Sequence, residues 1–204
     1  ADELQATAQA LTQLGGTIHA IVGDVADPIH RQALATTVHN IGQLDLLINN
    51  ASTLGATPMP MMAQYPLHEL TTVFNINVIA PVALIQAVLP VLKNSSGLVV
   101  NISSDAAKGG YETWSGYGAS KAALDLLSLT FANELRDEGV GVVSVDPGDM
   151  RTEMHQAAFP DEDISDRPLP EITVPFWAWL FGQDNLAVSG QRFEAQSERW
   201  EVTS

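Results

Sequence analysis

The sequence predicts an α/β fold in which a doubly wound parallel sheet carries helices on both faces, giving three layers. Short runs of β-branched and other apolar residues alternate with long segments of helical periodicity through most of the 204 residues. Glycine, asparagine, aspartate or proline follows most of these runs and marks a turn. Alternation of this kind is typical of parallel sheets whose strands are joined by right-handed helical crossovers. We therefore expect residues 1–204 to form a single domain without internal repeats.

The first quarter of the chain predicts two helices and two strands. A helical pattern covers residues 4–14 and ends at two glycines, and the β-branched segment 17–22 reads as a strand. A helix over residues 28–42 should begin after Asp27, whose carboxylate can cap it, with a proline in the first position. Segment 44–48 is an almost continuous apolar run, as expected of a strand that is covered on both faces.

The rest of the chain repeats this alternation. A long helix should cover residues 69–92, with Pro81 as a possible kink, and residues 153–179 are rich in proline and should be irregular. The remaining predicted elements are a strand at 97–102, a helix at 116–139, a strand at 140–145 and a short final strand within 187–194.

Composition argues against several classes of protein. Twenty-four acidic and nine basic side chains give a formal charge of −15, which would repel a nucleic-acid backbone. The chain has no cysteine, so we expect neither disulfides nor thiolate metal sites, and we expect a reducing, cytoplasmic location. The most apolar stretch, 78–92, is interrupted by two prolines and a glutamine, so no membrane span is expected. The acidic run 161–163 is interpreted as solvated surface, and no metal site is expected there.

The most informative residues are Tyr117 and Lys121, four positions apart on one predicted helix. This spacing places a phenol and an ammonium on the same helical face. A neighbouring cation favours the phenolate, so we expect Lys121 to lower the pKa of Tyr117 towards neutrality, where a general acid or base works best. Ser104 follows the strand at 97–102, where its hydroxyl could hold a carbonyl oxygen. A Tyr–Lys pair by itself is usually an ordinary solvated pair, so the interpretation depends on further elements.

Together with these residues, further elements resemble the short-chain dehydrogenase/reductase family, in the family's order and over essentially the whole chain. Asp24 and Val25 look like its adenine-contacting element, and they follow the segment at 17–22. The family's Asn-Asn-Ala-Gly element is matched here by Asn49, Asn50, Ala51 and Ser52, of which the last three are expected to contact the cofactor. Serine in place of the last glycine adds a Cβ, which a backbone with negative φ tolerates.

The catalytic and nicotinamide-contacting elements of the family also have counterparts. Asn77 matches its catalytic-site asparagine, which interrupts the helix and holds a water in a proton relay, and Asn75 is the competing assignment. Ser104 precedes Tyr117 by thirteen positions (117 − 104), the separation usual in the family. The loop after the strand at 140–145 resembles the family's Pro-Gly loop, which meets the nicotinamide carboxamide. The matching residues of this loop are Pro147, Gly148, Met150 and Thr152.

The resemblance implies a Rossmann-like enzyme that transfers a hydride between NAD or NADP and a small carbonyl compound or secondary alcohol. Tyr117 would be the general acid or base, Lys121 would tune it and bond the nicotinamide ribose, and Ser104 would orient the substrate. Asn77 would order the relay water. Residues 153–180 correspond to the family's variable substrate loop. The helices that carry Asn77 and Tyr117 correspond to the usual interface of a homodimer or homotetramer.

Two other kinds of function remain open at this point. A catalytically defective dinucleotide-binding or scaffold protein would keep the same fold, although a protein that only binds needs no proton donor. The second alternative is a different reaction on this fold, such as a dehydration, an epimerisation or an enoyl reduction. The combination of serine, tyrosine and lysine favours the dehydrogenase.

One part of the family pattern has no counterpart in this sequence. Family members begin with a strand, a glycine-rich turn, a helix and a second strand, whereas this sequence opens where the next helix is expected. We expect an N-terminally truncated member, whose sheet lacks a strand between segments 17–22 and 44–48. The glycine-rich turn binds the pyrophosphate at a helix N-terminus, and the second strand carries the residue that separates NAD from NADP. The preference between the two cofactors is therefore not readable.

Overall fold

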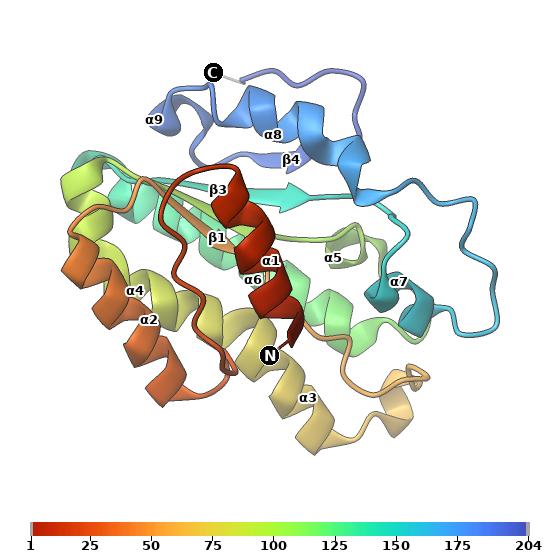
Figure 1. The fold of residues 1–204 in the computed structure, drawn as a ribbon. Helices are drawn as coiled ribbons and strands as arrows, with labels where there is room; N and C mark the ends of the chain where they lie inside the picture. Colours follow the sequence, from red (N-terminus) through yellow and green to blue (C-terminus); the bar gives the residue numbers. More distant parts are fainter. Residues whose placement is uncertain (1, 203–204) are drawn as a thin grey trace.

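Four parallel strands form one sheet in the computed structural model, which describes residues 2–202 (Figure 1). The strands are β1 (Leu46–Asn49), β2 (Leu98–Ile102), β3 (Gly141–Asp146) and β4 (Arg192–Glu194). Their order in space follows the chain, and Val100 of β2 pairs with Ile48 of β1 and with Val143 of β3. The parallel sheet predicted from the alternation is confirmed.

Helices connect the strands and flank the sheet. They are α1 (Asp2–Gln13), α2 (Pro28–Ile41), α3 (Leu67–Phe74), α4 (Ala80–Ser95), α5 (Ala106–Gly109), α6 (Ser115–Leu135), α7 (Glu153–Ala158), α8 (Val174–Leu180) and α9 (Asn185–Val188). Short 3-10 turns lie at Met62–Gln64, Arg136–Glu138 and Pro170–Thr173, and a π-helical turn lies at Asn75–Ile79.

The sheet lies between two layers of helices, so the predicted three-layer arrangement is confirmed (Figure 1). One face carries α2, α4 and α6, and side chains such as Ile85 pack there against Val99. The opposite face carries α8 and α9, and Phe176 packs there against Val100. Successive residues of β2 therefore enter different cores, which explains why this strand reads as a continuous apolar run rather than an alternating one.

Helix boundaries follow the signals in the sequence. Asp27 caps α2, because its Oδ1 accepts a hydrogen bond of 2.8 Å from the N–H of Ile29. Gly42 ends the same helix in the left-handed conformation, at a φ of 80°. Gly139 plays the same part after α6, at a φ of 77°. The predicted cap at Asp27 is confirmed, and the two glycines lie where the predicted helices were expected to end.

The long helix predicted before β2 is interrupted, but not by a kink at Pro81. The interruption is the π-helical turn Asn75–Ile79, in which the N–H of Ala80 bonds to the carbonyl of Asn75. Pro81 follows directly and has no N–H to offer the carbonyl of Asn77, four residues before it. Single π-helical turns recur at functional sites, and this one carries Asn77.

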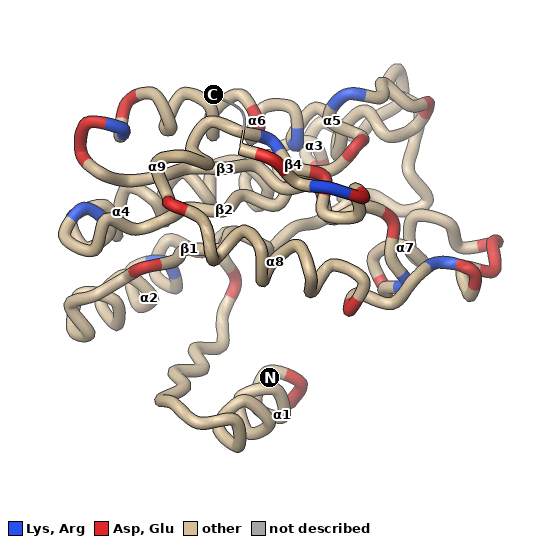
Figure 2. The backbone as a smooth tube through the Cα atoms, turned by 90° about the horizontal axis from the view of Figure 1, so that it is seen from above, with Lys and Arg blue, Asp and Glu red and all other residues tan. Residues whose placement is uncertain are grey.

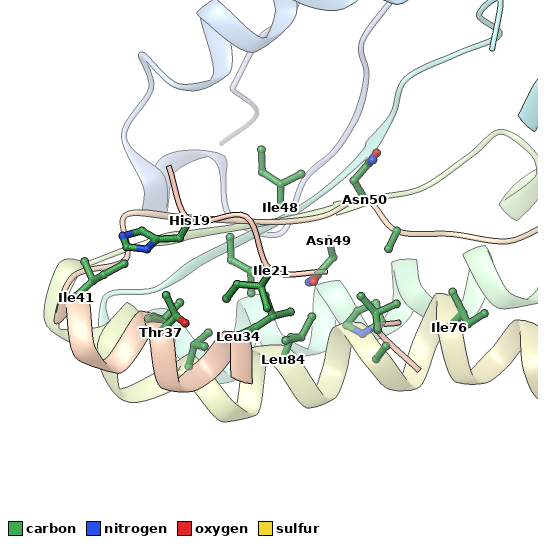
Figure 3. A pocket seen from close by; sticks show the side chains of 17 residues that line it. His19, Ile21, Leu34, Thr37, Ile41, Ile48, Asn49, Asn50, Ile76 and Leu84 are labelled. Carbon is green, nitrogen blue, oxygen red and sulfur yellow. The ribbon is translucent and has the colours of Figure 1, made fainter. Parts of the chain in front are cut away.

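The prediction of a strand at 17–22 is wrong. The segment is irregular, and Ile18 and Val22 are 39% and 60% exposed. Within the described chain β1 pairs with β2 alone, and a groove of about 350 Å³ lies beside it. His19 and Ile21 line this groove from the irregular segment, and Leu84 lines it from α4 (Figure 3). The segment has no neighbouring strand whose backbone could pair with it, so β-branched residues alone do not make it a strand.

The region expected to be irregular, 153–179, contains two helices. α7 follows the Pro-Gly loop, and the turn Pro170–Thr173 leads into α8. The strand predicted within 187–194 is confirmed for its last three residues, whereas α9 takes the first part. Aromatic residues of α8 pack this helix onto the sheet, since Phe176 is fully buried and its ring centroid lies 5.8 Å from that of Phe193.

α1 lies apart from the sheet and joins the rest of the chain through the irregular segment after it (Figure 2). No residue in this helix, all of which the structure describes, is buried. Its first turn carries Asp2 and Glu3, where negative charge suits the helix dipole. The helix thus has favourable local signals but no apolar surface covering its leucines.

One helical stretch among the described residues, Leu67–Ser95, is long and apolar enough to cross a membrane by length and composition. In the fold, 44% of its most apolar window is buried. α4 forms the last part of this stretch, and it packs on the sheet through side chains such as Ile85 and Leu92. Packing in the core therefore accounts for much of its apolar character.

Candidate active site

A pocket of about 300 Å³ lies where β1, β2 and β3 end. Ligands of open parallel sheets bind at this carboxyl edge, because the connecting loops there carry the polar side chains. Most of the predicted site residues meet in this pocket. They are Asn50, Ser52, Ser104, Tyr117, Lys121, Pro147, Gly148, Met150 and Thr152. The structure therefore brings together residues from four separate segments of the sequence.

Tyr117 lies in the first turn of α6, and its side chain is buried. Gly118 allows α5 to approach this turn, since a Cβ there would lie 2.6 Å from the carbonyl oxygen of Ala106. The indole of Trp114 packs edge-on against the phenol, with 5.9 Å between the ring centroids. Close helix packing and this aromatic contact fix the phenol at the wall of the pocket.

The environment of Tyr117 favours the neutral phenol. Burial raises the pKa of Tyr117 to about 12, although hydrogen bonding to Ser104 acts in the opposite direction. The carboxylates of Asp146 and Asp105 raise this pKa further. The prediction that Lys121 brings the pKa of the phenol towards neutrality is therefore wrong. The ammonium lies 5.5 Å from the ring centroid and bonds elsewhere, so burial dominates.

Lys121 lies one helical turn after the tyrosine and is 2% exposed. Its Nζ donates a hydrogen bond of 2.7 Å to the carbonyl of Ile102, at the end of β2. Burial lowers the pKa of Lys121 to about 8, and the carboxylate of Asp125 partly offsets this effect. Lys121 and Asp125 are again four residues apart, so the phenol, the ammonium and the carboxylate follow one stripe along α6.

Ser104 follows β2, and its hydroxyl already has two partners. Its Oγ donates to Oδ1 of Asp105 at 3.0 Å and accepts from the N–H of Ala106 at 3.2 Å. Tyr111 donates to the second carboxylate oxygen of Asp105 at 2.9 Å. A hydroxyl has one proton to donate, so a carbonyl oxygen bound by Ser104 would have to replace Asp105 as its acceptor.

Asn77 fastens the loop after β1 to α6. Its Oδ1 accepts from the N–H of Thr53 at 2.9 Å and from the hydroxyl of Ser52 at 3.2 Å. Its Nδ2 donates to the carbonyl of Thr53 and to the hydroxyl of Ser120, both at 2.9 Å. The buried amide thus uses both of its donors and both lone pairs of its oxygen. Asn75, the competing assignment, is exposed and makes no such contact.

The Pro-Gly loop after β3 is held by hydrogen bonds from two sides. Gly148 has a φ of 75°, and its N–H donates to Oδ1 of Asp146 at 3.0 Å. Gln196 donates to the carbonyl of Pro147 at 3.0 Å. Thr152 caps α7 by accepting from the N–H three residues further on, at 3.1 Å. These contacts fix the backbone that lines the pocket opposite the tyrosine-bearing helix.

Three predicted cofactor residues lie outside this pocket. Asp24 is exposed, and its Oδ1 accepts from the N–H of Ala26 at 2.8 Å. Val25 and Ala51 line the groove beside β1 instead. Asn50 lines both the groove and the pocket, so the two depressions meet at this residue. The role of Asp24 and Val25 at the adenine stays a prediction.

Several residues of the site were not predicted. The additional lining residues include Leu54, Asp105 and Trp114, whereas Met154 and His155 come from the substrate loop predicted at 153–180. His155, expected to be a loop residue, lies on α7. Asn101 accepts from Nδ2 of Asn49 and donates to the hydroxyl of Ser128, both at 2.8 Å, which ties β1 and β2 to α6. An asparagine inside an apolar strand was the available signal, because a buried amide requires partners.

Comparison with known proteins identifies the family to which the chain is similar. The family model described as short chain dehydrogenase matches residues 1–163. YciK, an uncharacterized oxidoreductase of Escherichia coli K12, is 35% identical over 161 residues, which are 78% of this chain and 63% of YciK. The chain therefore spans less than two thirds of the length of this curated relative.

Solved structures have the same fold. The structure of yciK from E. coli matches with a TM-score of 0.88 at 30% identity, over 96% of this chain and 81% of that one. A short chain dehydrogenase from Shigella flexneri, complexed with NADP, matches with a TM-score of 0.83 at 30% identity, over 96% and 83% of the two chains. Family model, relatives, fold and site agree, and the chain belongs to the short-chain dehydrogenase family.

Proposed function

We propose that the protein is an NAD(P)-dependent oxidoreductase that interconverts a small carbonyl compound and its secondary alcohol. The observation that carries the proposal is the meeting of Ser104, Tyr117 and Lys121 in one pocket at the carboxyl edge of the sheet. A binding or scaffold protein would need no buried phenol between a hydroxyl and an ammonium. This set of groups matches what proton transfer to or from a substrate oxygen requires.

The residues present fit the nicotinamide end of a dinucleotide. Asn50 and Ser52 line one part of the pocket and the Pro-Gly loop lines another, and Lys121 supplies an ammonium between β2 and α6. Nicotinamide, when bound, supplies or takes up the hydride. NADP is bound in the Shigella relative. For this chain we propose NAD or NADP, since the acidic or basic residue that distinguishes them has no counterpart in the sequence.

Tyr117 is proposed to move the proton at its phenolic oxygen. It holds this proton at neutral pH, because burial raises its pKa to about 12. Ser104 would orient the substrate oxygen by donating to it the hydrogen bond that now goes to Asp105. Asn77 would keep the neighbouring loop in place through its four hydrogen bonds and is proposed to order a relay water.

The charges of the pocket favour an uncharged substrate. Asp105, Asp146 and Asp149 line it, whereas Lys121 is the one lysine or arginine among its described lining residues. Leu54 and Trp114 contribute apolar surface beside the phenol. A substrate carboxylate or phosphate would face three acidic side chains, and the repulsion disfavours its binding.

The assembly and the location belong to the same proposal. We propose a homodimer or homotetramer that forms through the helices carrying Asn77 and Tyr117. In support, Ile79, Leu126 and Leu129 on these helices are exposed, as apolar interface residues of a free subunit would be. The absence of cysteine fits a cytoplasmic location, and the charge of −15 opposes a nucleic-acid partner.

The test measures nicotinamide absorbance with NADH and NADPH, in the whole protein, against a panel of ketones and alcohols. Tyr117→Phe should lose nearly all turnover, because the proton donor is gone, while calorimetry should show unchanged dinucleotide binding. The matched control is Tyr111→Phe, which removes an exposed phenol that bonds Asp105. Turnover retained by Tyr117→Phe would refute its role. Dinucleotide binding without any turnover by the natural protein would favour the binding or scaffold protein.

A further inference from the structure

Arg192 on β4 forms hydrogen bonds to three parts of the site from outside the pocket. The side chain of Arg192 is 16% exposed and lies on the sheet face that carries α6, whereas its neighbour Phe193 packs with α8 on the other face. Its NH2 donates to the carbonyl of Ser104 at 2.8 Å and to Oδ2 of Asp146 at 3.1 Å. Its Nε donates to Oδ2 of Asp125 at 3.0 Å.

Each acceptor of Arg192 supports a different functional segment. The carbonyl of Ser104 belongs to the backbone that presents the serine hydroxyl to the pocket. Asp146 uses its other oxygen to accept the N–H of Gly148 in the Pro-Gly loop. Asp125 lies one turn beyond the catalytic lysine on α6 and favours the charged form of that lysine. One guanidinium therefore connects the ends of β2 and β3 with α6.

The contacts are sheltered from water, which makes them hard to replace. The side chains of Asp125 and Asp146 are 18% and 7% exposed. Charge-assisted hydrogen bonds are strong in such surroundings, and an aspartate left there without its partner is costly. The planar guanidinium also presents its donors in fixed directions, so it sets the relative positions of its acceptors, which the single ammonium of a lysine cannot do.

We infer that Arg192 is a positioning residue of the site, which holds the serine backbone and the Pro-Gly loop in register with the tyrosine- and lysine-bearing helix. This inference rests on the proposed oxidoreductase function. Arg192 does not line the pocket, so it acts through Ser104, Asp146 and Asp125 and not by touching a substrate. Small displacements of catalytic groups reduce rates strongly, and this is the effect expected when the connection is removed.

The experiment compares Arg192→Met and Arg192→Lys with Arg136→Met in the whole protein. Arg136 is a matched control, because its NH1 also reaches a backbone carbonyl, that of Leu186 at 3.5 Å, but at the other end of α6. We expect Arg192→Met to lower kcat about tenfold or more, with a smaller change in the NADPH dissociation constant. The kcat of Arg192→Lys should lie between those of Arg192→Met and the natural protein, and the kcat of Arg136→Met should match that of the natural protein.

Chemical rescue provides a further test with the variant Arg192→Ala. Guanidinium below its denaturing concentration should restore part of the turnover of this variant, whereas urea at the same concentration should not.

A second readout does not depend on turnover. Hydrogen exchange of the amides in segments 103–106 and 148–149 should be faster in Arg192→Lys than in Arg136→Met, because both segments lose their shared anchor. Equal exchange in the two variants overturns the inference, as does a kcat of Arg192→Met within about twofold of the natural value. If Arg192→Met does not fold, Arg192→Lys decides by the same two measurements. A natural protein that reduces no carbonyl refutes the proposed function instead, and hydrogen exchange still decides the role of Arg192.

Discussion

Lys121 should make the stability of the protein depend on pH in a predictable direction. Its ammonium is 2% exposed, and burial lowers its pKa from 10.5 to about 8. Between these values the unfolded chain keeps the proton while the folded protein has lost it. Stability rises with pH wherever the unfolded state binds more protons, so the natural protein should gain stability across this window. Below about pH 8 the folded protein keeps Lys121 charged although it is buried, which lowers stability.

The expected size follows from the two pKa values. At about 1.4 kcal/mol per pH unit, the interval from 10.5 to about 8 corresponds to about 3 kcal/mol, of which about 2.5 kcal/mol should appear between about pH 7 and about pH 10. Lys121→Met removes the titrating group and should lack this gain. We therefore expect urea unfolding to show the variant losing about 2.5 kcal/mol relative to the natural protein as the pH rises over this range.

Two features of the protein make the assay specific. Lys108→Met is the matched control, because Lys108 is an exposed lysine on α5 and its removal should leave the pH dependence unchanged. Tyr117 acts in the opposite direction at higher pH, since its pKa is raised from 10 to about 12 and its contribution to stability is lost only above pH 10. Unfolding curves of Lys121→Met that run parallel to those of the natural protein from about pH 7 to about pH 10 would refute the assigned burial and pKa of Lys121.

Three further predictions concern the loop after β1, the substrate and the assembly. Asn77→Ala should lower the free energy of unfolding by about 2–4 kcal/mol in urea titrations, because four hydrogen bonds to buried or half-buried partners are lost, whereas Asn75→Ala should change it little. Asp149→Asn should raise kcat/KM for a 2-oxo acid severalfold and leave that for a neutral ketone unchanged, and equal effects on both would contradict the charge argument. Leu126→Glu should shift sedimentation towards the monomer, since the leucine is 67% exposed on α6; an unchanged coefficient would place the interface elsewhere.

The residues that could be predicted are those with local signals. Ser104 and Pro147 follow apolar runs, and runs of this kind become parallel strands whose ends share one edge of the sheet. Tyr117 and Lys121 are four residues apart, and the helical repeat alone predicts that they lie on one face of α6. The side chain of Asp27 and the proline after it were enough to predict the start of α2. In each case the deciding interaction lies within a few residues of the motif.

The features that escaped prediction depend on partners far away in the sequence. Segment 17–22 has strand-forming residues but no neighbouring strand among residues 2–202, and its backbone cannot join a ladder without one. The pKa of Tyr117 depends on burial and on Asp146, which its spacing from Lys121 does not reveal. Arg192 meets Asp125 and Ser104 across 67 and 88 positions of the chain. Nothing near Arg192 in the sequence marks it as part of the site.

One physical cause, burial, acts on both titrating groups of the site. It raises the pKa of Tyr117 and lowers that of Lys121, since each loses stability in its charged form. At neutral pH the phenol therefore keeps a proton that it can donate to a carbonyl oxygen. Oxidation of an alcohol would begin from the phenolate, whose formation is opposed by burial and by the carboxylates of Asp146 and Asp105. The protonation state of Tyr117 at neutral pH is thus the one that the proposed donation of a proton to a carbonyl oxygen requires.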